Sequence, residues 1–284
     1  MMHQPPLDPA QLRELLSFYA DAGVDEPLCE EPQDRFAETV KRAEPAREKA
    51  QRPAQEASGQ GRTTAAPQPP PRPALTAAVP DEAQAARARS LAREAGSLEE
   101  LKAILAEFDG CNLKSTAKSL VFADGNPEAD VMFVGEAPGR EEDLQGLPFV
   151  GRSGRLLDRM LAAIGRDRTS AYISNVIPWR PPGNRDPSPL ETEICRPFIE
   201  RHIELARPKV LVTLGNPSTK LLLNTQTGIM RMRGNWAVHN TPGGLVIPTL
   251  PSLHPAYLLR NPAHKKLAWR DFLAIQAKLA ERDS

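Results

Sequence analysis

The apolar positions in the second half of the chain form short, continuous runs separated by longer stretches with helical spacing. Such runs lack the alternation of a half-exposed strand and are typical of strands buried on both faces. Four runs occur, at residues 130–135, 171–176, 209–215 and 245–250. The helical stretches between them are residues 153–164, 189–206 and 216–224. This alternation predicts an α/β fold with a mainly parallel, four-stranded central sheet covered on both faces.

Two further helices are predicted just ahead of the first strand. Residues 81–108 are rich in Ala, Arg, Glu and Leu and are interrupted near Gly96. Ser97 and Glu100 have the spacing of a capping box, which favours a helix that begins there. We expect the folded domain to start with these helices.

The beginning of the chain predicts one short amphipathic helix. In residues 9–23 the apolar side chains recur at helical spacing, at Leu12, Leu15, Leu16 and Tyr19. Such a helix either docks on its own domain or binds a partner.

A long stretch after it predicts disorder. Residues 45–80 contain eight prolines and no aromatic residue, so they cannot bury enough apolar surface to offset their backbone entropy. The expected organisation is an N-terminal segment over residues 1–44, a disordered linker over 45–80 and a folded domain over 81–284.

Charge and cysteine content narrow the functional classes. The 284-residue chain has zero formal net charge, but residues 1–107 hold 13 basic and 18 acidic side chains, and residues 108–284 hold 23 and 18. The basic half tolerates a polyanionic partner without requiring one, and the acidic tail could compete for the same surface. Three cysteines are too few for a disulfide framework, no leader is evident, and no apolar run approaches about 18 residues. We expect a cytosolic protein without a membrane segment.

A short segment with at least one polar residue follows or ends each predicted strand. These segments are Gly135-Glu136, Asn175, Gly215-Asn216 and Ser252 to Pro255, which includes His254. Parallel strands share one carboxyl edge, and ligands of such sheets bind there. The sequence therefore predicts one site built from four distant loops.

Each residue also has a plainer interpretation. Glu136 could be a surface residue, Asn175 a turn residue, His254 a loop hydrogen-bonder and Phe149 a core residue. The turn from Gly135 to Gly139 could cradle a phosphate, but neither common glycine-rich phosphate motif is present. The plainer interpretations weaken together, because chance would not place all of these residues at one sheet edge.

The same region resembles the family-4 uracil-DNA glycosylases of bacteria and archaea. The resemblance covers about Cys111 to Trp269, more than half the chain, and rests on the stretches GNPEADVMFVGEAPGREEDLQGLPFVGRSGRLLDRML, YISNVIPWRPPGNRDPSPLE, VLVTLG and SLHPAYLLRNPAHKKLAW. It implies a three-layer α/β/α sandwich and hydrolysis of the N-glycosidic bond of deoxyuridine in DNA, as part of base-excision repair. Residues 81–284 would be the catalytic domain.

The resemblance implies a role for each site residue. Phe149 would stack on a uracil flipped out of the helix, and the Asn175 amide would pair with uracil O4 and N3–H. Glu136 would position or activate water, and His254 would stabilise the departing uracil anion. The other residues expected to bind uracil are Gly135 and Ala137.

Further residues are expected to bind DNA. Leu258 and Leu259 would fill the gap left by the flipped base, and Arg260 and Ser218 would contact phosphates. The full expected set is Gly139, Asn184, Arg185, Ser218, Leu258, Leu259 and Arg260.

One departure from the family is large. The family usually binds an iron–sulfur cluster through four cysteines, but here only Cys111 and Cys195 match, and Phe108 and Trp179 occupy the other two positions. Two thiolates cannot hold a cluster that four normally fix. We expect no cluster and no other cofactor, with aromatic packing in its place. A metal site made of Cys111, Cys195 and a histidine is the alternative.

Two other functions stay open. One is the superfamily variant that traps DNA covalently through a histidine, which is marked by an Arg- and His-rich insertion that residues 151–165 lack. The other is a non-catalytic binder of uracil-containing or single-stranded DNA. The main expectation is a monomeric enzyme of the cytoplasm and nucleoid that acts on single- or double-stranded uracil-containing DNA and releases free uracil.

Overall fold

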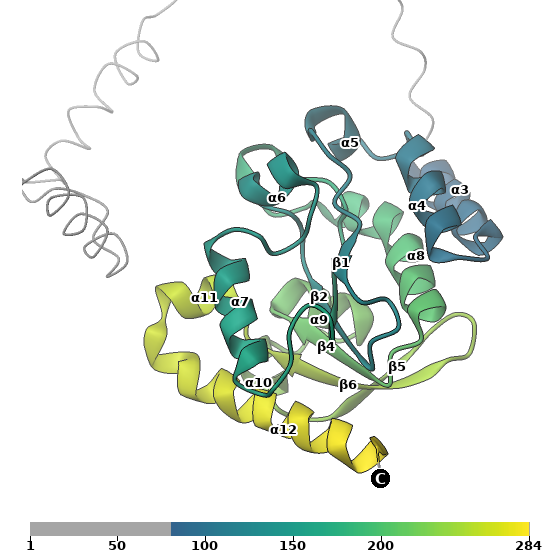
Figure 1. The fold of residues 1–284 in the computed structure, drawn as a ribbon. Helices are drawn as coiled ribbons and strands as arrows, with labels where there is room; N and C mark the ends of the chain where they lie inside the picture. Colours follow the sequence, from purple (N-terminus) through teal and green to yellow (C-terminus); the bar gives the residue numbers. More distant parts are fainter. Residues whose placement is uncertain (1–80, 284) are drawn as a thin grey trace, which may run out of the picture. The chain divides into compact units, whose positions relative to one another are not determined.

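A six-stranded sheet lies at the centre of residues 81–283, the part of the chain that the computed structural model describes (Figure 1). The strand order is β1-β3-β2-β4-β6-β5. The strands are β1 (Ala123–Gly125), β2 (Val131–Gly135), β3 (Tyr172–Asn175), β4 (Val210–Leu214), β5 (Ala237–Asn240) and β6 (Val246–Ser252).

The sheet has two strands more than the four predicted. The predicted strands are β2, β3, β4 and β6, which run parallel in the centre. β1 and β5 pair antiparallel with β3 and β6 at the two edges. β1 has only three residues, all half-buried, and the Val238 side chain of β5 is 51% exposed. Neither edge strand forms a continuous apolar run, so the pattern that identified the central strands misses them.

Helices cover both faces of the sheet, because successive side chains of a strand point to opposite sides. Val131 and Phe133 of β2 pack with helices on one face, and Met132 and Val134 pack with helices on the other. The first face carries α7 (Arg152–Ala162) and α12 (Lys265–Asp283). The second carries α3 (Asp81–Glu94), α4 (Leu98–Glu107) and α8 (Pro189–Ala206). The three-layer α/β/α fold expected from the sequence is confirmed.

Local capping explains where two of these helices begin. At α4, Ser97 Oγ accepts a hydrogen bond from the Glu100 backbone N–H, and Glu100 Oε2 accepts one from the Gly96 N–H at 2.7 Å. At α8, Ser188 and Glu191 form a reciprocal capping box. The two helices predicted ahead of the first strand are confirmed as α3 and α4.

The remaining helices are short and lie in the connections. They are α5 (Leu113–Thr116), α6 (Arg140–Gln145), α9 (Asn216–Leu222), α10 (Ile229–Met232), α11 (Pro255–Arg260) and the 3-10 turns η1 (Pro182–Asn184) and η2 (Pro262–His264). From β2 the chain moves to β3 on one side, then returns to β4 on the other. This reversal places a crevice at the carboxyl ends of the central strands.

Some expectations fall outside the described residues. The helix predicted in residues 9–23 and the linker predicted in 45–80 lie there, so the division of the chain into three parts stays a prediction. None of the described helices has both the length and the apolar character that crossing a bilayer requires.

Candidate active site

A cavity of about 490 Å³ opens at the carboxyl edge of the sheet. Its lining includes Glu136 after β2, Asn175 at the end of β3, Asn216 after β4 and His254 after β6. The structure therefore brings the four predicted loops together around one space. The predicted site residues that line it are Glu136, Ala137, Gly139, Phe149, Asn175, Asn184, Arg185, His254 and Arg260.

One wall of the cavity combines an amide with an aromatic ring. Asn175 and Phe149 are both almost completely buried. A Cβ atom built on Gly135 would lie 2.5 Å from Asn175 Oδ1 and 2.6 Å from Phe149 Cζ. Gly135 does not itself line the cavity, but its missing side chain lets the amide and the ring lie side by side.

The Asn175 amide has an unused acceptor. Asn175 Oδ1 is buried and has no hydrogen-bond partner within the described residues. Leaving a buried acceptor unpaired costs about 1–3 kcal/mol, so such an atom on a residue that lines a cavity favours a ligand that donates a hydrogen bond. The neighbouring Phe149 ring offers a flat apolar face to the same ligand.

Glu136 places a carboxyl group at the end of β2, where the side chain is half-buried. Burial raises the pKa of this carboxyl above its ordinary value, and the nearby carboxylate of Asp186 raises it further. Both effects disfavour the charged form, as is common for acid–base groups in active sites.

His254 is the N-cap of α11, and its Nδ1 atom accepts a hydrogen bond from the Ala256 N–H at 3.1 Å. Burial, together with the charge of Arg260, lowers the pKa of His254 to about 4, against the opposing effect of the Glu142 carboxylate. The ring is therefore neutral at pH 7, with its proton on Nε2 because Nδ1 is an acceptor. It lies 5.4 Å from the Phe149 ring, centroid to centroid, so a neutral donor stands beside the stacking face.

The turn after β2 is fixed by Glu142 of α6. Its carboxylate accepts hydrogen bonds from the backbone N–H groups of Gly139, Val150 and Gly151 at 3.1, 3.1 and 2.9 Å. Gly139 was predicted to bind DNA, and it does line the cavity. Its N–H, however, already donates to Glu142.

Two predicted DNA contacts, Ser218 and Leu258, are buried, whereas Leu259 is partly exposed and stays a prediction. Ser218 is fully buried and its hydroxyl donates to the Leu214 carbonyl, so the predicted phosphate contact is wrong in this structure. Leu258 is 1% exposed and packs into a small apolar cluster, and Leu259 packs against the same cluster. Helical spacing in α11 turns Leu258 inward, so it is not available to fill a gap in the base stack.

The other predicted DNA contacts lie at the mouth of the cavity. Arg260 and Asn184 are exposed and line it. Arg185 also lines it, but its guanidinium forms two hydrogen bonds with Glu191, at 2.6 and 2.9 Å. Arg185 therefore fixes the loop to the start of α8.

The structure adds residues that sequence reasoning did not place in the site. Tyr257, Asp186 and Ser153 line the cavity, and the Tyr257 hydroxyl lies 2.6 Å from His264 Nδ1. Tyr257 stands inside the HPAYLLR segment and Asp186 directly follows Asn184 and Arg185. Their nearness to predicted residues was the signal, but the sequence alone did not show which way they point.

Phe108, Cys111, Trp179 and Cys195 form a second buried group, which we call the aromatic cluster. All four are at most 2% exposed. The two sulfur atoms are 3.9 Å apart, and the Phe108 ring meets the ring of Phe198 edge to face at 5.0 Å between centroids.

The aromatic cluster does not fit an iron–sulfur group. It offers two thiols, whereas such clusters are held by four ligands. The thiol of Cys195 donates to Cys111 and is buried, and both effects keep its pKa well above the ordinary value. Within residues 81–283, no histidine or carboxylate joins the two cysteines in a group that could hold a metal ion.

Comparison with known proteins agrees with this geometry. The profile of the Uracil DNA glycosylase superfamily matches residues 122–273. The chain belongs to this superfamily.

Similar proteins narrow the class further. The type-4 uracil-DNA glycosylase of Sulfurisphaera tokodaii is 39% identical over 185 residues, which cover 63% of this chain and 84% of that protein. The type-4 enzyme of Archaeoglobus fulgidus is 39% identical over 183 residues, covering 63% and 92%. That of Thermotoga maritima is 40% identical over 172 residues, covering 59% and 88%.

Proposed function

We propose that this protein is a monofunctional uracil-DNA glycosylase of base-excision repair, which hydrolyses the N-glycosidic bond of a flipped deoxyuridine. The observation that carries the proposal is the buried Asn175 Oδ1, which lies beside the Phe149 ring and has no hydrogen-bond partner in the described part of the chain. Membership of the superfamily and the similarity to type-4 enzymes support it. An abasic site remains in the DNA, and uracil leaves as the free base.

The Asn175 amide selects the base. Its Oδ1 accepts from uracil N3–H and its Nδ2 donates to uracil O4, and the base stacks on Phe149. Cytosine presents an acceptor at N3 and a donor at position 4, so both hydrogen bonds would fail. A base inside a duplex cannot reach this cavity, so the nucleotide must flip out, at a cost of a few kcal/mol.

Glu136 and His254 serve the two charges that develop during cleavage. The sugar becomes positive as the bond breaks, and the Glu136 carboxylate stabilises this charge and orients the attacking water. The uracil becomes negative, and the neutral His254 ring donates its Nε2–H to uracil O2. Preorganised groups of this kind stabilise the transition state more than the bound substrate.

DNA contacts surround the mouth of the cavity. Arg260 is exposed beside His254 and contacts a backbone phosphate, and Asn184 lies at the same rim. The protein acts as a monomer on single- or double-stranded uracil-containing DNA. The protein acts in the cytoplasm, on the DNA of the nucleoid.

We also propose that the protein holds no iron–sulfur cluster. Support comes from the donor set, because Phe108 and Trp179 supply no ligand atoms. Anaerobically purified protein is then expected to be colourless. Stoichiometric iron in elemental analysis would contradict this.

Uracil release from a defined oligonucleotide tests the function. The protein is incubated with a uracil-containing oligonucleotide, and abasic sites are cut by hot alkali. We expect cleavage at uracil and none in a matched thymine oligonucleotide. Asn175→Asp is the site control, because a carboxylate cannot donate to uracil O4, and the loss should be about 2–4 kcal/mol of transition-state stabilisation. Tight binding without any strand cutting by the unaltered protein would identify a non-catalytic binder instead.

A further inference from the structure

Phe149 holds its ring in the cavity through an unusual backbone conformation. Its φ angle is +55°, a left-handed value that residues other than Gly rarely adopt. Its carbonyl also lies tightly against the first turn of α7, where a Cβ atom built on Gly154 would fall 1.6 Å from the Phe149 oxygen. A conformation of this kind persists only when its surroundings fix it.

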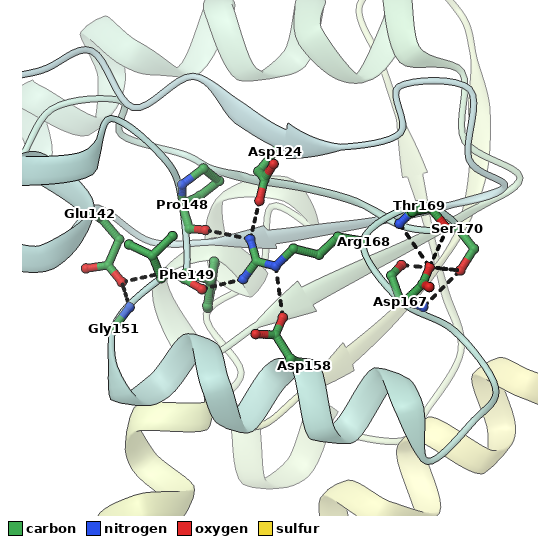
Figure 2. A network of polar contacts seen from close by, with 11 residues as sticks. Asp124, Glu142, Pro148, Phe149, Gly151, Asp158, Asp167, Arg168, Thr169 and Ser170 are labelled. Atoms are coloured by element: carbon green, nitrogen blue, oxygen red, sulfur yellow. Dashed lines mark hydrogen bonds and ion pairs between the residues drawn. The ribbon is translucent and has the colours of Figure 1, made fainter.

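Arg168 supplies much of that support from outside the cavity. It lies in the connection between α7 and β3, and its guanidinium donates to the backbone carbonyls of Pro148, at 3.2 Å, and Phe149, at 2.5 Å. Figure 2 shows the guanidinium between these carbonyls and the carboxylates of Asp124 and Asp158. The Asp158 hydrogen bond measures 2.9 Å, and Asp124 of β1 pairs with the same group.

A second side chain fixes the following peptide groups. Glu142 Oε1 accepts from the N–H group of Val150 and from that of Gly151, the second of which is labelled in Figure 2. Arg168 and Glu142 therefore hold consecutive backbone groups on both sides of the Phe149 Cα atom. Because Asp124 and Asp158 neutralise the charge of Arg168, this arginine is not available as a phosphate contact.

We propose that Arg168 is a positioning residue for uracil capture, which acts by fixing the Phe149 backbone so that the ring stands ready for the flipped base. The inference rests on the proposed function, because it names how that site is preorganised. Arg168 does not line the cavity, so its effect must pass through Phe149. Without it, the loop relaxes toward an ordinary negative φ and the ring leaves its place.

A double-mutant cycle separates this role from general stabilisation. The variants are Arg168→Ala, Phe149→Ala and the two combined, measured by single-turnover excision from a saturating uracil-containing single-stranded oligonucleotide. Arg168→Ala alone should lower the rate about 10–100-fold, because a displacement near 1 Å at a site has effects of this size. In the Phe149→Ala background the same change should cost less than about threefold, since the ring through which it acts is gone. Two losses that simply multiply would overturn the proposal.

Arg201→Ala is the matched control. Arg201 is exposed to a similar extent and also holds a backbone carbonyl, that of Ala95, together with the carboxylate of Glu204. It lies on α8, away from the cavity lining. We expect a lower Tm with an unchanged excision rate. A rate loss equal to that of Arg168→Ala would show that lost stability alone explains the effect.

Arg168→Lys tests the proposal even if Arg168→Ala does not fold. Lysine keeps a positive charge between Asp124 and Asp158 but lacks the planar fork that reaches two carbonyls. We expect a Tm close to that of the unaltered protein and a reduced rate of excision. An unchanged rate would contradict the role of the carbonyl contacts.

If the unaltered protein releases no uracil, the proposed function fails. The same cycle, measured on the preference for binding uracil- over thymine-containing oligonucleotide, then still tests Arg168.

Discussion

The active-site cavity and the aromatic cluster are both buried, but they differ in how their polar groups are paired. In the cavity, Asn175 Oδ1 has no hydrogen-bond partner among residues 81–283, the pKa of Glu136 is raised and that of His254 is lowered. In the aromatic cluster, two thiols contact each other and large rings fill the remaining space. An unpaired acceptor on a residue that lines a cavity favours a ligand there, whereas dense apolar packing favours stability. Substitutions in the two regions should therefore change different quantities.

Phe108→Ala should have the largest effect, and on stability. Phe108 is 1% exposed and packs against Phe198, and removing such a ring from a core typically costs about 3–5 kcal/mol. Urea denaturation measures the loss. Single-turnover excision by the fraction that stays folded should be near normal, and Phe108→Leu should be intermediate in stability. A strong loss of excision at full stability would mean that the aromatic cluster takes part in the site.

His254→Ala should show the reverse behaviour. Removing one preorganised donor to a developing anion commonly costs about 3–4 kcal/mol, or about 100–1000-fold in rate. DNA binding should change little, because the donor acts mainly in the transition state. The free energy of unfolding should fall by only about 1 kcal/mol, because His254 also caps the start of α11. Single-turnover excision and equilibrium binding are compared on the same oligonucleotide. Cleavage at the normal rate with weak binding would reduce His254 to a DNA contact.

The comparison also explains which parts of the fold the sequence predicts. The central strands and their covering helices are visible because burial on both faces requires continuous apolar runs, as in β2 and β4. The edge strand β1 is not visible, because three half-buried residues carry no such pattern. Yet β1 supplies Asp124, one of the two carboxylates that hold Arg168.

The sequence predicted which residues lie near the cavity better than it predicted which way their side chains point. Asn175, Glu136 and His254 stand directly at strand ends, where a parallel sheet fixes their position. Leu258 and Ser218 lie inside short helices, where one step along the helix decides between core and surface. The sequence does not reveal that step without the packing of α11 against α7. The sequence does not reveal Arg168, because two of its partners are backbone carbonyls and the other two, the carboxylates of Asp124 and Asp158, come close to it only in the fold.

The pH dependence of excision sharpens the contrast within the cavity. Because the pKa of Glu136 is raised, its carboxyl keeps a proton to a higher pH than an ordinary glutamate does. Activity that needs the carboxylate is present above this pKa and is lost as the pH falls through it. The pKa of His254 is about 4, so that ring stays neutral at the higher pH values where the Glu136 carboxylate forms. A pH–rate profile of single-turnover excision should show one acidic limb that Glu136→Gln removes. A limb that survives in Glu136→Gln would assign it to another group.

Arg260→Ala should have the smallest effect, and it probes the rim of the cavity. Arg260 is exposed beside His254, so its proposed partner is a phosphate in contact with solvent. Losing one phosphate contact should reduce the slope of log affinity against log salt by about 0.7–0.9. Single-turnover excision at saturating DNA should change little, because the contact forms before the bond breaks.

Arg93→Ala is the control for this prediction. It removes an exposed charge on α3, away from the cavity lining, and should leave the slope unchanged. Equal slopes for the two variants would remove Arg260 from the DNA contact surface, and recognition would then rest on the cavity itself.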